Sequence, residues 1–153
     1  MTETRIDMDE LRSLTDKLKA STQLDELLLG DLQQLLQETE RGETPRWIQS
    51  VVDELLDKLD REFRHSRDPH QWQLVIERYP TWENRVNALI SEGGRLLEEL
   101  RELRRRIADC VGDRIPVEVR RDLVGWVRRF ADFRHRERQL LLDAANLDVG
   151  QGE

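Results

Sequence analysis

Apolar residues recur every three or four positions along most of the chain, and this spacing places them on one face of an α-helix. The segment between residues 45 and 65 is the clearest case. Its apolar members are Ile48, Val51, Val52, Leu55, Leu56, Leu59 and Phe63. No segment alternates apolar and polar residues in the manner of a β-strand. The pattern therefore predicts an all-α protein.

Capping residues and prolines divide this pattern into separate helices. Thr22 followed by Asp25 is typical of a helix start, and Asp68 precedes Pro69 as an N-cap. We predict long helices over residues 23–41, 45–65, 80–111 and 117–146, a short N-terminal helix over 7–20 and a short connecting helix over 69–78. The tail over 147–153 has the composition of a turn.

Four long helices with short connections predict an up-down-up-down four-helix bundle. With 153 residues the chain suits one compact domain that buries a proper core. We assign residues 1–22 to an N-terminal arm and residues 23–153 to the bundle. The arm has a stripe of Leu11, Leu14 and Leu18, which packs either on its own bundle or on a second chain.

The apolar face of each long helix contains a polar side chain or a glycine when successive residues are placed 100° apart. These positions are Asp31 on the first helix, Glu62 and Ser66 on the second, Gly93 and Arg104 on the third, and Arg134 and Glu137 on the fourth. A buried carboxylate has to be paired with a cation or bound to a metal. We therefore expect a buried polar layer, which is also how helical bundles build cofactor sites.

Three stretches carry a resemblance to a known family, the hemerythrin-like cation-binding bundles. The family's third helix, with a Glu-His pair after a proline start, resembles YPTWENRVNALISEGGRLLEELREL. Its second and last helices, each with a His-x-x-x-Glu pair, are similar to LLDKLDREFRHS and RHRERQLLLDAANLDVGQGE. The resemblance covers roughly residues 24–153 and implies the same four-helix fold.

The resemblance also implies that most of the family's metal ligands are absent from this chain. The corresponding positions are Asp31 on the first helix, Glu62 and Ser66 on the second, Glu92 and Gly93 on the third, and Phe133 and Glu137 on the fourth. The family's di-iron centre uses five histidines, whereas this chain contains three. An intact centre is therefore excluded.

An ion-pair layer is the first way to satisfy the buried polar positions. Arg134 lies three residues before Glu137 on the fourth helix, and Arg104 is expected to point inward from the third. A guanidinium placed among Asp31, Glu62 and Glu137 balances their charge. We expect this layer to replace the metal centre, with no cofactor bound.

A metal site is the alternative. Glu62 and His65 have the Glu-x-x-His spacing of ferritin-like carboxylate sites. With Asp31 and Glu137 opposite, iron or another divalent metal has mixed oxygen and nitrogen ligands. No second Glu-x-x-His motif accompanies the first, and His135 has the position of a surface or boundary residue.

Charge and composition narrow the classes of function. Asp and Glu outnumber Lys and Arg by 32 to 25, and this net charge of −7 disfavours a nucleic-acid binder. The sequence has no apolar run of membrane-spanning length and no signal-peptide core, so we expect a cytoplasmic protein without a membrane partner. Cys110 is the only cysteine, which excludes an intrachain disulfide.

Other candidate sites have plainer interpretations. The arginines of the third and fourth helices alternate with acidic residues, so we expect solvated, salt-bridged faces. Trp47, Trp82 and Trp126 are expected in the core or at helix junctions, and Trp72 is a candidate for an exposed contact. No phosphate-binding loop or nucleophile-base pair has a usable context.

These observations favour a non-enzymatic, metal-free hemerythrin-like domain that acts through protein interaction or signalling, with a protein partner or a second copy of the chain. The alternative function is a metal- or oxygen-related binding protein with a non-standard site between the helices.

Overall fold

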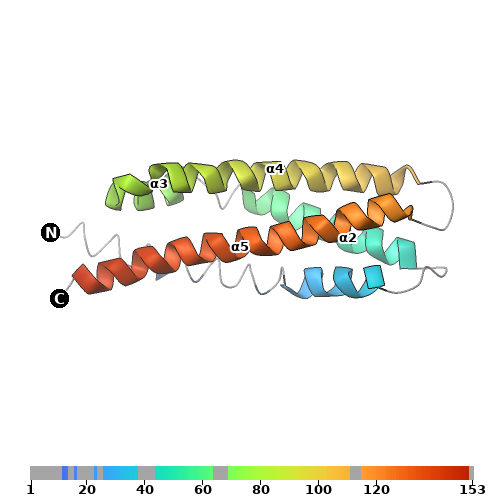
Figure 1. Ribbon diagram of the computed structural model, residues 1–153, viewed down its shortest axis with the longest axis horizontal. Coiled ribbons are helices and arrows are strands. Elements are labelled where there is room, and N and C mark those ends of the chain that lie inside the picture. Colours follow the sequence, from blue (N-terminus) through green and yellow to red (C-terminus); the bar gives the residue numbers. More distant parts are fainter. Residues whose placement is uncertain are drawn as a thin grey trace.

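The computed structural model describes residues 12–13, 16, 23, 26–37, 44–63, 69–110 and 115–151. Its elements are a helix over 26–37, α2 (Thr44–Arg61), α3 (Pro69–Arg78), the 3-10 helix η2 (Pro80–Trp82), α4 (Glu83–Ala108) and α5 (Val117–Gln151). These residues contain no strand, and the helices pack along one long axis (Figure 1). The predicted all-α bundle is confirmed. The leucines of the predicted N-terminal stripe lie outside the described residues.

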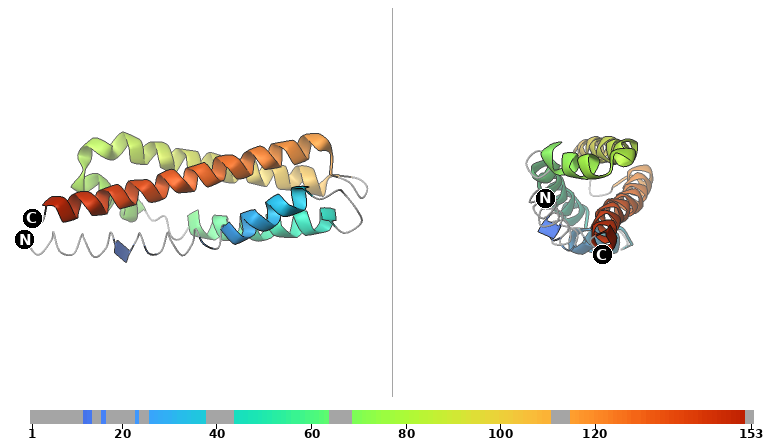
Figure 2. Two further views of the ribbon diagram at one scale, coloured as in Figure 1. Left: turned by 60° about the horizontal axis from the view of Figure 1, so that its bottom comes forward. Right: turned by 90° about the vertical axis from the view of Figure 1, so that its left-hand side faces the viewer.

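Successive long helices run in opposite directions. In Figure 1 the helix over 26–37 and α4 run from left to right, whereas α2 and α5 run from right to left. Viewed along the long axis, these helices surround a common centre (Figure 2, right). α4 packs against both α2 and α5. Short connections force each helix to return beside the previous one, as the sequence predicts.

Two boundaries differ from the prediction. The third long helix starts as the 3-10 turn of η2, because Pro80 fixes the backbone but has no N–H to donate. α5 continues to Gln151, so the turn predicted from residue 147 onward is wrong over 147–151. No proline follows Asn146, and a glycine costs a helix only about 1 kcal/mol relative to alanine, so the helix continues through Gly150.

The buried residues of α4 follow a repeat of seven. They alternate at intervals of three and four, at Val86, Leu89, Gly93, Leu96, Leu100, Leu103 and Ile107, with Leu97 beside them. Such a repeat has 3.5 residues per turn, as in a coiled coil, whereas steps of 100° assume 3.6. Over about five turns from Val86 this difference shifts the buried position by about half a residue, from Arg104 toward Leu103. The predicted inward position of Arg104 is therefore wrong, since its side chain is half-exposed.

The buried residues of α5 follow the same repeat. At intervals of three and four these are Val119, Leu123, Trp126, Phe130, Phe133, Glu137, Leu140 and Ala144, with Val127, Arg134 and Leu141 beside them. The Trp126 indole N–H donates to the Leu96 carbonyl of α4 at 2.8 Å. The two helices thus form an antiparallel seam in which Glu137 takes a central core position.

The helix over 26–37 buries a different face from the predicted one. Leu29, Leu32 and Leu36 lie in the core, whereas Leu27 and Asp31 face solvent. The three consecutive leucines at 27–29 fit two adjacent stripes, so periodicity alone does not choose between them. Burying the stripe that contains Leu32 avoids desolvation of the Asp31 carboxylate. Asp31 is therefore not part of a buried layer.

Two tryptophans differ from their expected positions. Trp72 on α3 is buried in the core, whereas Trp47 on α2 is 57% exposed. Trp82 stacks on Tyr79 with ring centroids 4.7 Å apart, and the Tyr79 hydroxyl donates to the Ala144 carbonyl at 3.1 Å. This contact ties the start of α4 to the C-terminal part of α5.

The outer faces carry the expected salt bridges. Arg101 pairs with Asp60 on α2 and with Glu98 on its own helix, and Arg104 pairs with Asp53 on α2. None of the helices in the described ranges is both long and apolar enough to cross a membrane.

Candidate functional site

A charged group lies inside the bundle at Arg134. Its side chain is 3% exposed, although guanidinium groups are almost never buried without a partner. Arg134 is one heptad from Val127 and one from Leu141, both of which are buried and apolar. The helical repeat of α5 therefore forces this arginine toward the interior, where a leucine or valine would be ordinary.

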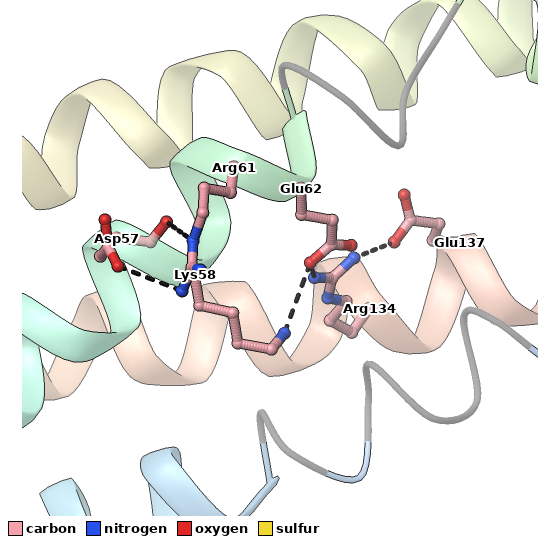
Figure 3. Close-up of polar contacts among 6 residues, drawn as sticks. All are labelled: Asp57, Lys58, Arg61, Glu62, Arg134 and Glu137. Carbon is pink, nitrogen blue, oxygen red and sulfur yellow. Dashed lines mark hydrogen bonds and ion pairs between the residues drawn. The ribbon is translucent and has the colours of Figure 1, made fainter.

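Two carboxylates bind the Arg134 guanidinium, one from its own helix and one from α2. It donates to the Glu137 carboxylate on α5 at 2.7 Å and to the Glu62 carboxylate at the end of α2 at 2.6 Å. The Lys58 ammonium lies 3.4 Å from the same Glu62 oxygen. Figure 3 shows the guanidinium between the two carboxylates, with Lys58 on the far side of Glu62. We call Lys58, Glu62, Arg134 and Glu137 the ionic layer, and its formal charges sum to zero.

Aromatic rings enclose the guanidinium. Its central carbon lies 5.1 Å from the centroid of Phe130 and 5.8 Å from that of Phe63, which are cation–π distances. Phe133 meets both rings, at 6.1 Å from Phe130 and 6.5 Å from Phe63. The rings exclude water, so the charges interact across a medium of low polarizability.

A π-helical turn at Glu62 and Phe63 follows the last α-helical residue of α2. A wider turn changes the direction in which side chains leave the helix, and such turns occur often at functional sites. Here it directs one carboxylate and one ring of α2 toward the same arginine of α5.

The ionic layer is costly to build and costly to break. Removing charges from water offsets much of their mutual attraction, so the assembled layer contributes little net stability. Loss of one partner is different, because an unpaired buried charge costs about 3–5 kcal/mol. The ion pair between Glu62 and Arg134 therefore requires that α2 and α5 meet in one register.

The other predicted site residues have separate positions. Arg104 pairs with Asp53 at the edge of the α2–α4 contact, and Asp31 is on the surface. Gly93 is buried in α4. Ser66 and His65 lie outside the described residues, and His135 is exposed. Of the seven positions proposed for the buried layer, the structure brings together Glu62, Arg134 and Glu137.

Lys58 and the aromatic enclosure were not identified from sequence. A signal exists for Lys58, because it precedes Glu62 by four residues and ion pairs at this spacing are common on helices. No comparable signal places Phe63 and Phe130 around Arg134. Those contacts need the relative rotation of two helices, which a single helical wheel does not contain.

The register of the α4–α5 seam shows which residue of α5 lies level with Gly93. The rim of the seam pairs Glu92 with Arg136 and Glu99 with Arg129. In an antiparallel pair of helices with this repeat, Gly93, the core position that follows Glu92, faces Phe133, three residues before Arg136. This register puts Gly93 level with Phe133, and both residues are buried.

The residues of the ionic layer do not fit a metal. Both carboxylates bind Arg134, so a divalent cation between them would lie against the positive charge of the guanidinium. Within the described part of the chain, no group of three or more His, Cys, Asp and Glu side chains is arranged to hold an ion. The Arg134 guanidinium supplies the positive charge between these two carboxylates, where a metal ion would otherwise lie.

Comparisons with protein-family models, with curated proteins and with solved structures find no match to this chain. A fold does not by itself imply a function, so the function has to be argued from the residues and their geometry.

Proposed function

We propose that this protein is a non-enzymatic, metal-free helical domain, resembling the hemerythrin-like bundles, that acts through contacts with another protein. The observation that carries the proposal is the position of Arg134, whose guanidinium binds Glu62 and Glu137 inside the bundle. Together with Lys58, this fixed organic cation balances the two carboxylates without a metal ion.

The positions that correspond to the family's ligands support this proposal. Glu62 and Glu137 keep carboxylates, but both are bound to Arg134. Gly93 and Phe133, at two of the other positions, are both buried in the core and have no ligating side chain. With guanidinium and phenyl groups in place of imidazoles, these positions offer iron no nitrogen ligand, and their carboxylates are already bound to Arg134.

The arrangement of charged groups within the described residues favours a binding role over an enzymatic one. The charged groups of the core are bound to one another and enclosed by rings, so they have no access to a substrate. Large apolar side chains are exposed instead at Leu27 and Trp47, on neighbouring helices. Exposed apolar surface of this kind is a feature of protein interaction sites. We place the protein in the cytoplasm, where its one free cysteine remains reduced.

Metal analysis tests the proposal. We expect freshly purified protein to contain less than one tenth of an equivalent of iron, manganese or zinc, and to show no absorbance from an oxo-bridged iron pair. Protein incubated with iron(II) in the absence of oxygen and then desalted should give the same result. Stoichiometric metal in either sample would contradict the proposal and support a metal- or oxygen-related binding protein.

An Arg134→Met variant is the matched sample for this experiment. Loss of the guanidinium leaves Glu62 and Glu137 without their shared cation, so a divalent ion would be attracted only in this variant. Weak metal uptake by the variant alone would show that the arginine stands in the place of a metal. Equal metal uptake by both proteins would show that metal binding does not depend on Arg134.

A further inference from the structure

A surface pocket lies between the helix over 26–37 and α2. It has a volume of about 250 Å³ and is open to solvent. Its lining residues are Asp31, Gln34 and Leu35 from the first of these helices, and Trp47 and Val51 from α2. The spacing of three or four residues on each helix brings these side chains to one shared groove. The volume is below that of most small-molecule sites and suits one long side chain of a partner.

The polar groups of this pocket are available for binding. Among the described residues, no hydrogen bond or ion pair uses the Asp31 carboxylate, the Gln34 amide or the Trp47 indole N–H. Asp31 is exposed, and Trp47 presents more than half of its surface to solvent. Leu35 and Val51 give the pocket an apolar wall. A carboxylate, an aromatic face and an apolar wall together match a long cationic side chain.

Charge around the pocket favours the same ligand. Residues 26–37 and 44–63 carry seven acidic and three basic side chains. Ion pairs among the described residues leave three of the carboxylates unpaired, at Glu26, Asp31 and Glu54, against one guanidinium at Arg46. The whole chain has a net charge of −7. A negative surface of this kind attracts a basic partner and repels an acidic one.

We propose that this pocket is a docking site for a lysine or arginine side chain presented by a basic helical segment of a partner protein. The aliphatic stem packs on Leu35 and Val51, the cationic group lies over the Trp47 ring, and Asp31 accepts its hydrogen bond. Leu27, one turn before Asp31, extends the contact with apolar surface. The inference rests on the proposed role in protein contacts, and it names the chemistry of the partner.

Titration with two model peptides tests the docking site. Both are capped Leu-Ala helical peptides, identical except for one central residue, which is lysine in one and norleucine in the other. Binding is followed on the full-length ¹⁵N-labelled protein through the indole N–H signals of its four tryptophans, with the Trp47 signal assigned by its loss in Trp47→Leu. We expect the lysine peptide to shift the Trp47 signal with a saturable response and the norleucine peptide to bind at least fivefold more weakly.

Three variants separate the contacts. Asp31→Asn should raise the dissociation constant of the lysine peptide about fivefold. Trp47→Leu should abolish saturable binding; because this variant lacks the indole signal, binding is followed by the backbone N–H signals of the other pocket residues. Glu54→Gln removes a nearby charge that does not line the pocket and should change the constant less than twofold. All three positions are exposed, so circular dichroism should show unchanged helix content.

Two results would overturn the docking proposal. Equal binding of the two peptides would show that the pocket takes an apolar side chain, and the absence of any saturable Trp47 shift would show that it does not bind a cation. Neither result bears on Arg134. Conversely, stoichiometric iron in the core would defeat the proposed function while leaving the Trp47 titration as it stands.

Discussion

At the scale of single residues, Arg134 decides how the core is built. Hydrophobic burial favours an apolar residue at its position, but the guanidinium finds two carboxylates and two aromatic faces within contact distance. Glu62 and Glu137 in turn depend on it. The three side chains form one unit because the ion pairs between them offset part of the cost of burying each charge.

Removal of the arginine alone should therefore be severe. We expect Arg134→Met to lower the free energy of unfolding by about 3–5 kcal/mol, since it leaves two carboxylates inside the bundle without their shared cation. Urea unfolding followed by circular dichroism measures this change. The control is Arg61→Met, which breaks an ion pair with Asp57 whose two side chains are each 70% exposed. The control should cost less than about 1 kcal/mol, and a similar loss in both variants would show that Arg134 is hydrated.

The adjacent glycines of α4 have opposite environments. Gly93 is buried and level with Phe133, whereas Gly94 is exposed and a Cβ added to it meets no atom within 4 Å. We expect Gly94→Ala to stabilise the protein by up to about 1 kcal/mol, because alanine favours a helix over glycine. Gly93→Leu should destabilise it by about 1–3 kcal/mol through overpacking. Thermal unfolding of the two variants measures both changes. If both substitutions change stability in the same direction, the two glycines do not have opposite environments.

At the scale of helices, α4 and α5 are aligned by a ladder of ion pairs along the rim of their seam. The pairs are Arg85–Asp143, Glu92–Arg136, Glu99–Arg129 and Arg106–Asp122. Each step of seven residues along α4 meets a step of seven back along α5. The hydrogen bond that Arg136 donates to the Glu92 carboxylate, with support from Asp132, raises the pKa of Arg136.

The order of the charges fixes the register of this ladder. Along α4 the signs are plus, minus, minus, plus, and α5 presents the complementary order. A slip of seven residues in either direction would create two like-charged pairs among the three that remain. Each exposed pair contributes only about 0.2–1 kcal/mol. Their arrangement therefore matters more for the choice of register than for total stability.

A charge exchange tests the ladder. Arg129→Glu places two acidic groups together at Glu99, and we expect it to lower the free energy of unfolding by about 1 kcal/mol in low salt. Addition of Glu99→Arg restores an attractive pair and should recover most of the loss. In 1 M salt both differences should shrink, because the screening length falls to about 3 Å. If the double variant is as unstable as the single one, these side chains do not pair in solution.

At the scale of the whole molecule, the ionic layer connects helices that are not consecutive. α2 and α5 both pack on α4, and the pair between Glu62 and Arg134 joins them directly. Apolar contacts tolerate several rotations of a helix, whereas a buried ion pair tolerates one. We infer that the layer specifies how these helices meet, and that its loss as a unit affects uniqueness of the fold more than stability.

Replacement of Glu62, Arg134 and Glu137 together, with Lys58 kept, separates these effects. We expect the triple variant Glu62→Leu, Arg134→Met and Glu137→Leu to be at least as stable as the native protein, because apolar residues of similar volume avoid the desolvation cost. Its calorimetric transition should be broader and its NMR spectrum less dispersed. A triple variant as unstable as Arg134→Met would show instead that the layer contributes net stability.

The sequence by itself determined the class of fold and the chemistry of its core. Helical periodicity, prolines and capping residues are local signals, and they sufficed for the helices and their alternating directions. They also sufficed to single out Glu62, Gly93, Arg134 and Glu137, because each interrupts an apolar face of its own helix.

Only the tertiary structure decided which polar positions meet. Asp31 turned outward because three consecutive leucines allow two rotations of its helix, and neighbouring helices select one. Arg104 reached the rim because a seam between two helices follows 3.5 residues per turn and not 3.6. The enclosure of Arg134 by Phe63 and Phe130, and the pocket at Trp47, depend on contacts between helices. Such contacts are set by the packing of several helices at once, which no single segment of the sequence contains.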